Sequence, residues 1–346
     1  MSSATATTLD VFPEQTPSYI LSFQFSSWYP KFSDVSIKST IIKPLSDVFR
    51  KYLESESVFV PEGSDDLPVE STLSDDEEPP ESDDDGEAPP SYAFPDLDAE
   101  IRASIKQYDG VFPKLNFTSP RDAAWVLAAG SPLKCTTPAD VYLLLKSSDF
   151  IMHDLERATV FEGCEGDESS WSPYELELVL RKWYPINPSR EVRCFVRNGK
   201  LVGISQRDTN YYDFLNVSET QDVIRSSVMR LWEEKIKPRQ EQRDYVFDLL
   251  LTRDLSRGHV VDFNPYAPKT DSLLFSYKDL CDLAVADNAT EFRVIDSPAH
   301  PLAIRNAPVH QHNAVPMEAI QLSSGRSIDE FAELWKAQLN ESTEDA

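Results

Sequence analysis

Three oxygen-bearing side chains interrupt apolar, strand-like stretches in the last third of the chain. Asp248 lies inside YVFDLLL, and Asp262 and Asn264 lie inside HVVDFNP. The turn residues between these stretches predict a hairpin, and a five-residue loop at 253–257 would set Asp248 opposite Asp262. Because side chains alternate along a strand, Asn264 would point to the same face as both acids.

Two opposed carboxylates on an apolar sheet need a positive partner, because they repel each other and both lose hydration. Carboxylate and amide oxygens, without a thiol or imidazole, suit a hard ion, and Mg²⁺ is usually held by one or two carboxylates together with substrate phosphates. The alternative is that one Asp is protonated or caps the adjoining turn. With a metal site, replacing Asp262 with Ala should spare or raise the stability of the metal-free protein.

Phosphates bound to such a metal would need positive side chains, and other strand-like stretches contain them. They are Lys114 in FPKLN, Arg181 and Lys182 in LVLRKW, and Arg193 in EVRCFV. Taken singly, a cation at a strand end is ordinarily a solvated edge residue. Four of them in strand-like stretches favour a site for a phosphate-bearing ligand.

A second hairpin is predicted in REVRCFVRNGKLVGISQRD, because Asn198-Gly199 is a preferred two-residue turn. An unbroken register from this turn sets Glu191 opposite Gln206. Both would then share one face with Arg193, near one end of the strands.

Helical patterns fill much of the remaining chain. The loop FTSPRDAAW is expected to lead into a helix that begins near Ser119 or Asp122. A capping box at Ser327–Glu330 precedes an amphipathic pattern that contains Trp335. Helices are therefore expected at 45–54, 95–110, 137–150, 222–237 and 327–339.

The acidic residues are concentrated in one segment. The chain has 346 residues and a formal net charge of -26, and residues 61–100 contain 16 acids and no Lys or Arg. Such a segment cannot bury enough apolar area to offset its ordering entropy, so a disordered insert is expected, either a solubilising linker or a phosphorylated regulatory segment. We expect an N-terminal part of the first lobe at 1–60, the insert at 61–98, a lobe with the loop at 99–180, a second lobe at 181–295, and a Pro-containing linker with a terminal helix at 296–346.

Charge and patterning argue against several classes of protein. Phosphate backbones and anionic lipids would repel this chain, so neither nucleic acid nor a membrane is an expected partner. No signal peptide or membrane-spanning stretch is predicted, which favours a cytoplasmic protein. The four cysteines are widely separated, without a zinc or disulfide pattern, and His310 and His312 are interpreted as loop residues.

Several of these stretches together resemble the cell-division-cycle protein 123 family. The similar motifs, in order, are FQFSSWYPKF, PKLNFTSPRDAAW, LLKSSDF, ELVLRKW, RCFV, LVGISQRD, VFDLLL and VDFNP with TDSLLF. They cover most of residues 20–280. The resemblance implies an α+β, ATP-grasp-like fold in which two lobes, with mainly antiparallel sheets, clamp ATP and Mg²⁺. It also implies a monomeric assembly chaperone that binds the γ subunit of eukaryotic translation initiation factor 2.

The resemblance also implies roles for individual residues. Asp248, Asp262 and Asn264 would be Mg²⁺ ligands. Nucleotide contacts would come from these three and from Lys114, Asn116, Ser119, Arg181, Lys182, Trp183, Glu191, Arg193, Gln206, Asp271 and Ser272. The loop FTSPRDAAW departs from the ATP-grasp pattern because it has no glycine, which puts its coverage of the phosphates in doubt.

Three functions follow as hypotheses. The first is a chaperone whose bound ATP fixes the arrangement that grips the γ subunit. The second is an ATP-dependent carboxylate ligase, in which Lys114 and Arg193 stabilise the migrating phosphoryl group, although no second-substrate site is evident. The third is a scaffold that binds through exposed aromatics, either Trp28 and Tyr29 or Trp335, with core packing favoured for Trp28 and Tyr29.

Overall fold

The chain divides into two compact units, residues 1–208 with 212–296 and residues 209–211 with 297–346. All the predicted site residues belong to the first unit. The expected helix at 327–339, both loop histidines and most of the acidic segment lie outside the described residues. The computed structural model describes residues 9–55, 60–65, 92–127, 131–166, 171, 173–286 and 289–305.

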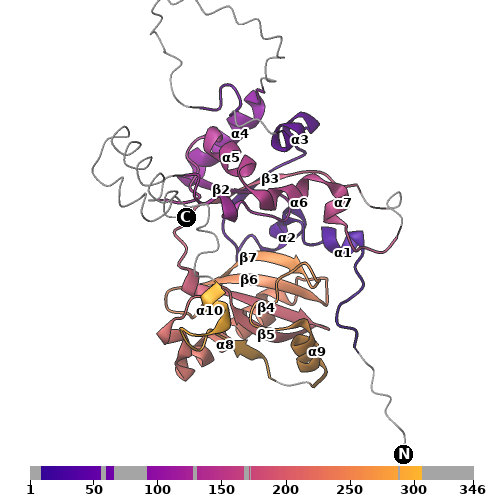
Figure 1. The fold of residues 1–346 in the computed structure, drawn as a ribbon, viewed down its shortest axis with the longest axis vertical. Helices are drawn as coiled ribbons and strands as arrows, with labels where there is room; N and C mark the ends of the chain where they lie inside the picture. The colour runs from indigo at the N-terminus through magenta and orange to yellow at the C-terminus, as the bar shows by residue number, and fades with distance from the viewer. Residues whose placement is uncertain are drawn as a thin grey trace, which may run out of the picture. The chain divides into compact units, whose positions relative to one another are not determined.

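A three-stranded antiparallel sheet forms one part of the first unit (Figure 1). Its order is β1 (Ser39–Ile42), β3 (Leu178–Lys182) and β2 (Val111–Lys114). The side chains of Leu178, Val179 and Leu180 are fully buried, because β3 is the central strand. The helices that pack with this sheet are α3 (Asp47–Glu54), α4 (Pro95–Tyr108) and α5 (Pro138–Lys146).

A five-stranded sheet forms the other part. Its order is β7 (Gly258–Pro265), β6 (Tyr245–Leu251), β4 (Glu191–Arg197), β5 (Lys200–Gln206) and β8 (Glu291–Arg293). Only the pairing of β5 with β8 is parallel. The predicted α+β class with mainly antiparallel sheets is therefore confirmed.

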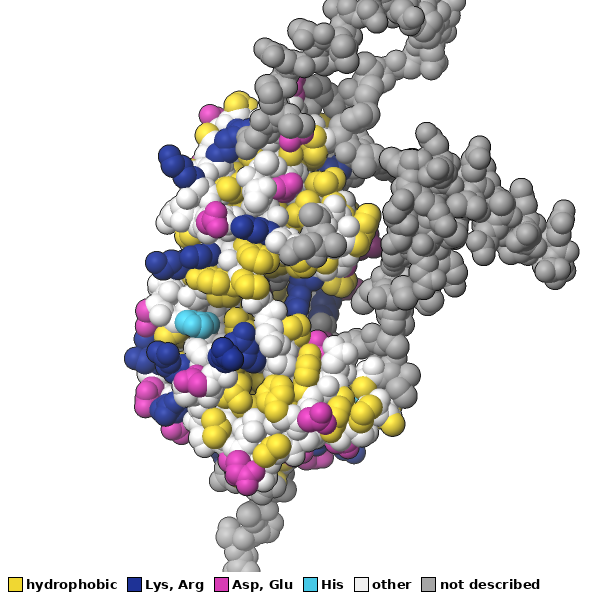
Figure 2. Space-filling view, turned by 90° about the vertical axis from the view of Figure 1, so that its left-hand side faces the viewer, with side chains coloured by type: hydrophobic (Ala, Val, Ile, Leu, Met, Phe, Trp, Pro, Cys, Tyr) yellow, Lys and Arg dark blue, Asp and Glu magenta, His cyan; other side chains and the backbone are white. Residues whose placement is uncertain are grey.

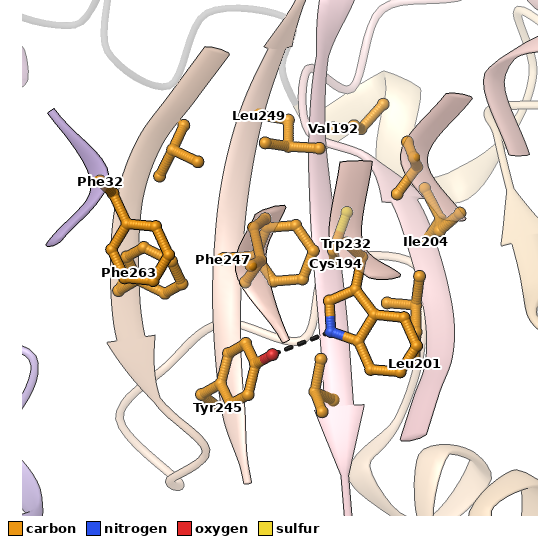
Figure 3. Close-up of a cluster of buried hydrophobic side chains, with 14 of the residues drawn as sticks. Phe32, Val192, Cys194, Leu201, Ile204, Trp232, Tyr245, Phe247, Leu249 and Phe263 are labelled. Carbon is orange, nitrogen blue, oxygen red and sulfur yellow. Dashed lines mark hydrogen bonds between the residues drawn. The ribbon is translucent and has the colours of Figure 1, made fainter. Parts of the chain in front are cut away.

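One face of the five-stranded sheet carries an aromatic core (Figure 3). Phe247 and Phe263 extend from β6 and β7, and Trp232 donates a 2.8 Å hydrogen bond from Nε1 to the hydroxyl of Tyr245. Helix α8 (Ser218–Leu231) supplies Ile224 and Val228 to this core. The opposite face packs partly against α9 (Tyr277–Ala286), through Leu280.

Helix α2 (Phe25–Phe32) joins the two sheets. The ring of Trp28 lies 5.2 Å from that of Phe263, and the side chain of Trp28 is only 2% exposed. The hydroxyl of Tyr29 accepts a hydrogen bond from the Ser39 N–H group. The core interpretation of Trp28 is thus confirmed, which removes it as a candidate anchor for a partner.

Shorter elements connect these layers. The stretch expected to become a helix after Ser119 forms only a 3₁₀ turn, η1, so that prediction is wrong over the described residues. Among the described residues, no helix has the length and apolar character needed to span a bilayer. The remaining elements are α1 (Pro17–Leu21), η1 (Arg121–Ala123), η2 (Asp149–Ile151), α6 (Met152–Leu155), α7 (Arg157–Val160), η4 (Pro188–Arg190), η5 (Asp213–Asn216), η6 (Trp232–Ile236) and, in the second unit, α10 (Pro301–Arg305).

The hairpin of β6 and β7 confirms one predicted register by an unexpected route. Leu251 pairs with Gly258, so the loop has one residue more than predicted. An irregularity between the Asp248 and Leu249 pairs leaves Val261 as an extra residue in β7. The two offsets cancel, and Asp248 lies opposite Asp262 with Asn264 on the same face.

The hairpin of β4 and β5 departs from its predicted register. The Asn198-Gly199 turn pairs Arg197 with Lys200 as expected, but an irregularity follows in β5, so that Val192 pairs with Gln206. Because one extra residue reverses the facing of the strand, Gln206 points away from Arg193. Glu191 and Arg193 share a face as predicted, but the prediction that Gln206 shares it is wrong, and Arg207 takes the place assigned to Gln206.

Gly203 marks this irregular stretch of β5. A Cβ atom at this position would lie 2.8 Å from Cδ2 of Leu280 and 3.1 Å from Cζ of Phe275. The absence of a side chain therefore lets α9 pack close to the sheet.

Candidate functional site

A buried ion pair connects the two sheets. Lys114, the last residue of β2, is fully buried, and its Nζ lies 2.8 Å from Oδ2 of Asp262 on β7. Asp262 Oδ1 also accepts a 3.1 Å hydrogen bond from the Phe263 N–H group. The predicted proximity of Lys114 to the Asp pair is confirmed, and Lys114 is the ion-pair partner of Asp262.

Asp248 has a different cation. Arg193 Nε donates to Oδ1 over 2.8 Å and Nη2 donates to Oδ2 over 2.9 Å, and Arg207 Nε lies 3.3 Å from Oδ2. Burial acts to raise the pKa of Asp248, but the charges of Arg193 and Arg207 outweigh it and hold that pKa below its ordinary value. The two opposed carboxylates are therefore neutralised separately, one by lysine and the other by arginine.

Glu191 gathers two further cations that the sequence reasoning missed. Its Oε2 lies 3.5 Å from Nη2 of Arg121 and 3.5 Å from Nη1 of Arg207. The charge of Arg207, followed by burial, lowers the pKa of Arg121. Because two repelling guanidinium groups share a single carboxylate, the local charge favours an additional anion.

Two side chains in this region, one buried and one partly buried, have buried polar atoms without a hydrogen-bond partner among the described residues. Arg181 donates from Nη1 to the Val261 carbonyl over 2.8 Å, but its Nε and Nη2 have no hydrogen-bond partner among the described residues. Burial lowers the pKa of Arg181, whose guanidinium lies 5.5 Å from the centre of the Phe25 ring. Asn264 Nδ2 is also buried without a partner in the described part of the chain. Since buried polar atoms are normally paired, these atoms point to a polar ligand.

The metal prediction can be compared with the donors present. Within the described ranges, no group of three His, Cys, Asp or Glu side chains is arranged to hold a metal ion. Asp262 and Asn264 provide carboxylate and amide oxygens on one face, which suits a hard cation that is completed by phosphate oxygens. Both oxygens of Asp248 are already engaged by guanidinium groups. Asp262 also has both oxygens engaged, one by Lys114 and one by the Phe263 N–H group, so Asp262 and Asn264 fit Mg²⁺ if the cation takes the place of Lys114 at Asp262.

Other predicted contacts are engaged in holding the backbone. Asn116 is fully buried, donates to the Glu175 carbonyl over 2.7 Å and accepts from the Glu177 N–H group over 2.9 Å. Gln206 donates to the Asp208 carbonyl over 2.6 Å and accepts from the Ile295 N–H group over 3.0 Å. These two amides position strands and neighbouring segments.

Among the remaining predicted residues, Asp271 contacts a cation of the site, and the others have contacts elsewhere. The Asp271 carbonyl accepts from Arg193 Nη1 over 2.9 Å, and Ser272 Oγ donates to the Phe275 carbonyl over 2.6 Å. Trp183 Nε1 donates to the Pro132 carbonyl over 3.2 Å, and Lys182 Nζ lies 5.2 Å from the centre of the Tyr184 ring. The Ser119 carbonyl accepts from the Arg121 N–H group over 2.8 Å.

The glycine-free loop is held in place by two carboxylates. Asp154 Oδ2 accepts from the N–H groups of Phe117 and Thr118, over 2.8 and 2.9 Å. Asp122 accepts from the Ser148 hydroxyl over 2.5 Å and from the Asp149 N–H group over 2.8 Å. Arg121 is therefore presented to Glu191 by a loop anchored at both ends.

On the face shown in Figure 2, Lys and Arg side chains lie inside a hollow at mid-height, with hydrophobic side chains above and below. Cations at such a depth are less hydrated than surface cations and attract anions more strongly.

The depressed pKa of Asp248 predicts a pH effect. An Asp whose pKa is lowered by folding contributes stability above its unfolded pKa of about 3.9, and this contribution disappears as the pH falls through the folded pKa. Asp248→Asn should therefore be less stable than the wild type at pH 6, with a difference that shrinks below about pH 4. Urea unfolding of both proteins between these pH values measures the difference in stability. A difference that does not change with pH would contradict the lowered pKa of Asp248.

Comparisons with known proteins extend this description. The family model described as D123 matches residues 28–323. The chain is 36% identical to a protein from Schizosaccharomyces pombe named translation initiation factor eIF2 assembly protein, over 95% of this chain and 98% of the relative. A Xenopus laevis protein of the same name is also 36% identical, over 94% of this chain and 98% of the relative. The solved structure of Cdc123 from Schizosaccharomyces pombe is similar with a TM-score of 0.67 and 34% identity, covering 82% of this chain and 100% of that one.

Proposed function

The chain belongs to the D123 family, and from this premise we propose that it assists the assembly of eukaryotic translation initiation factor 2 as an ATP- and Mg²⁺-binding chaperone. The names of its relatives support the role in assembly. We further propose that its direct partner is the γ subunit of that factor.

The cation cluster between the two sheets is the observation that carries the nucleotide proposal. Lys114 and Arg181 come from the three-stranded sheet, whereas Arg193 comes from the five-stranded sheet and Arg207 follows its strand β5. A triphosphate placed here would contact both sheets at once. Its binding would therefore hold the two sheets in one arrangement, and a surface that binds a partner needs such a fixed arrangement.

Asp262 and Asn264 would hold Mg²⁺, which when bound neutralises part of the phosphate charge. Lys114 would then exchange Asp262 for a phosphate oxygen. Arg193 would keep Asp248 ionised and in position, Arg207 would contact both Asp248 and a phosphate oxygen, and Arg181 would pair its unsatisfied nitrogens with the ligand. In this proposal the chain's residues bind and orient, and no transfer step is assigned to them.

Coupling between nucleotide and partner is the direct test of this function. Calorimetry should show that ATP with Mg²⁺ raises the affinity for the γ subunit by roughly 5-fold or more, with the same factor for the effect of the subunit on ATP affinity. Equal partner affinities with and without the nucleotide would overturn the proposal. Release of ADP that depends on the subunit would favour ligase chemistry instead.

Arg207 provides a test of the site that its sequence position alone did not suggest. Arg207→Met should weaken ATP binding roughly tenfold, because a charged hydrogen bond is worth about 1.5–3 kcal/mol. Arg243→Met is the matched control, since Arg243 is exposed and bonds to the Asn198 side chain outside the site. If both variants bind ATP like the wild type, Arg207 does not contact the nucleotide.

A further inference from the structure

A second concave region lies outside the candidate nucleotide site. Its volume is about 400 Å³, and it lies where the β4–β5 turn, the end of α8 and the segment before β8 meet. None of its residues belongs to the cation cluster described above. The lining residues are Gly199, Lys200, Leu201, Arg225, Met229, Trp232, Lys237, Ala289 and Thr290.

A π-helical turn builds one wall of this groove. The turn, η6, begins at Trp232, and the Lys237 N–H group donates to the Trp232 carbonyl over 2.8 Å. The indole is fixed by its hydrogen bond to Tyr245, and Lys237 Nζ lies 4.7 Å from the centre of the indole ring. Single π turns are rare within helices and are frequent at functional sites, because they place side chains where an α-helix would not.

The groove combines an apolar floor with a cationic rim. Leu201, Met229 and Trp232 supply the floor, and Lys200 and Lys237 are exposed. The third cation, Arg225, forms an ion pair of 2.6 Å with Asp222 on the same helix. None of the described residues that line the groove is acidic, although acids outnumber Lys and Arg by 59 to 33 in the chain. The described lining of the groove is thus positive, whereas the protein as a whole is negative.

Lys200 begins β5 on one side of the groove, whereas Arg225 and Lys237 come from α8 and from the end of η6, so an extended peptide laid along the groove could contact both sides. We propose that this groove docks an acidic segment of a partner protein, which inserts one aliphatic or aromatic side chain over Trp232. Carboxylates on either side of that side chain pair with Lys200 and Lys237. Apolar burial supplies affinity here, and charge complementarity selects the acidic sequence.

Peptide selection on the full chain tests this assignment. A display library of random peptides, each about 12 residues long so that it can span the groove in extended form, is selected against the wild-type protein. The enriched peptides are then measured by fluorescence anisotropy. The expected consensus has at least two acids flanking one large apolar residue, with affinity that falls as salt rises. A consensus without acids, or no enrichment, overturns the proposal.

Matched variants locate the binding. Lys200→Glu/Lys237→Glu should weaken the selected peptides at least tenfold, whereas Lys106→Glu/Lys278→Glu, with the same charge change on exposed residues elsewhere, should change binding less than twofold. Ala289→Trp should block the groove sterically, because Ala289 lines it and is itself exposed. Equal binding by the two charge-reversal variants would overturn the proposal.

Two further measurements are needed. The first tests whether the peptide binds the groove or the nucleotide site, and the second tests whether the natural occupant is a partner's segment or the chain's own acidic segment. Saturating ATP with Mg²⁺ should not displace the peptide, and loss of ATP binding in the Lys114→Met/Asp262→Leu variant, whose apolar pair should preserve most of the stability, should leave peptide affinity unchanged. Displacement by ATP would assign the peptide to the nucleotide site and overturn the groove. If deletion of residues 66–91 raises peptide affinity, the chain's own acidic segment is the occupant, and the assignment to a partner fails.

Discussion

Asp262→Ala is expected to abolish Mg²⁺-dependent ATP binding and to lower the free energy of unfolding by about 3–5 kcal/mol. The stability loss follows from Lys114, which is fully buried and pairs with Asp262 over 2.8 Å. Removing the carboxylate leaves an uncompensated ammonium group between the two sheets. The sequence alone suggested the opposite effect, because it presented Asp262 only as the repelling neighbour of Asp248. Urea unfolding and ATP calorimetry measure the two effects.

A double variant separates stability from binding. Lys114→Met/Asp262→Leu replaces the ion pair with apolar side chains and should recover most of the lost stability, since buried pairs are often replaced by apolar groups at little cost. It should still fail to bind ATP. If Asp262→Ala alone is as stable as the wild type, the pair does not stabilise the fold, and water must replace the carboxylate.

The predicted position of the Asp pair is correct because two deviations from the predicted hairpin cancel. Asp248 and Asp262 face each other as the hairpin pattern requires, although the longer loop and the extra residue Val261 enter with opposite effects. In the neighbouring hairpin a single irregularity has no compensation, and it turns Gln206 away from Arg193. This irregularity lies beside Gly203, where the close approach of α9 leaves no room for a side chain, and a strand pattern does not reveal that contact.

The cations of the site could be predicted as a group, but their partners could not. Lys114 and Arg193 are recognisable as charges inside apolar strands. Their pairing with Asp262 and Asp248 depends on how one sheet meets the other and on which strands are neighbours in the second sheet. For a related reason Arg121 is not predicted, since it lies in a loop whose position is fixed by contacts with Asp154 and Ser148, which are distant in the sequence. Long-range packing therefore decides which charges meet.

Arg193→Met should also have a large effect, about 3–5 kcal/mol in unfolding free energy, together with loss of ATP binding. Asp248 is 3% exposed, and without Arg193 its remaining ion pair among the described residues would be with Arg207, whose Nε lies 3.3 Å from Oδ2. Arg193→Lys should lose less stability than Arg193→Met, because lysine retains the positive charge although it cannot form the two parallel hydrogen bonds.

Arg239→Met is the matched control for burial. Arg239 also contacts both oxygens of a carboxylate, at 2.5 and 3.1 Å from Asp34, but the two side chains are 32% and 56% exposed. An exposed pair contributes at most about 1 kcal/mol, so the free energy of unfolding of this control, measured in urea, should be close to that of the wild type. Equal losses for Arg193→Met and Arg239→Met would show that burial does not determine the strength of these pairs. In that case the stability assigned to the ion pairs between and within the two sheets would also fail.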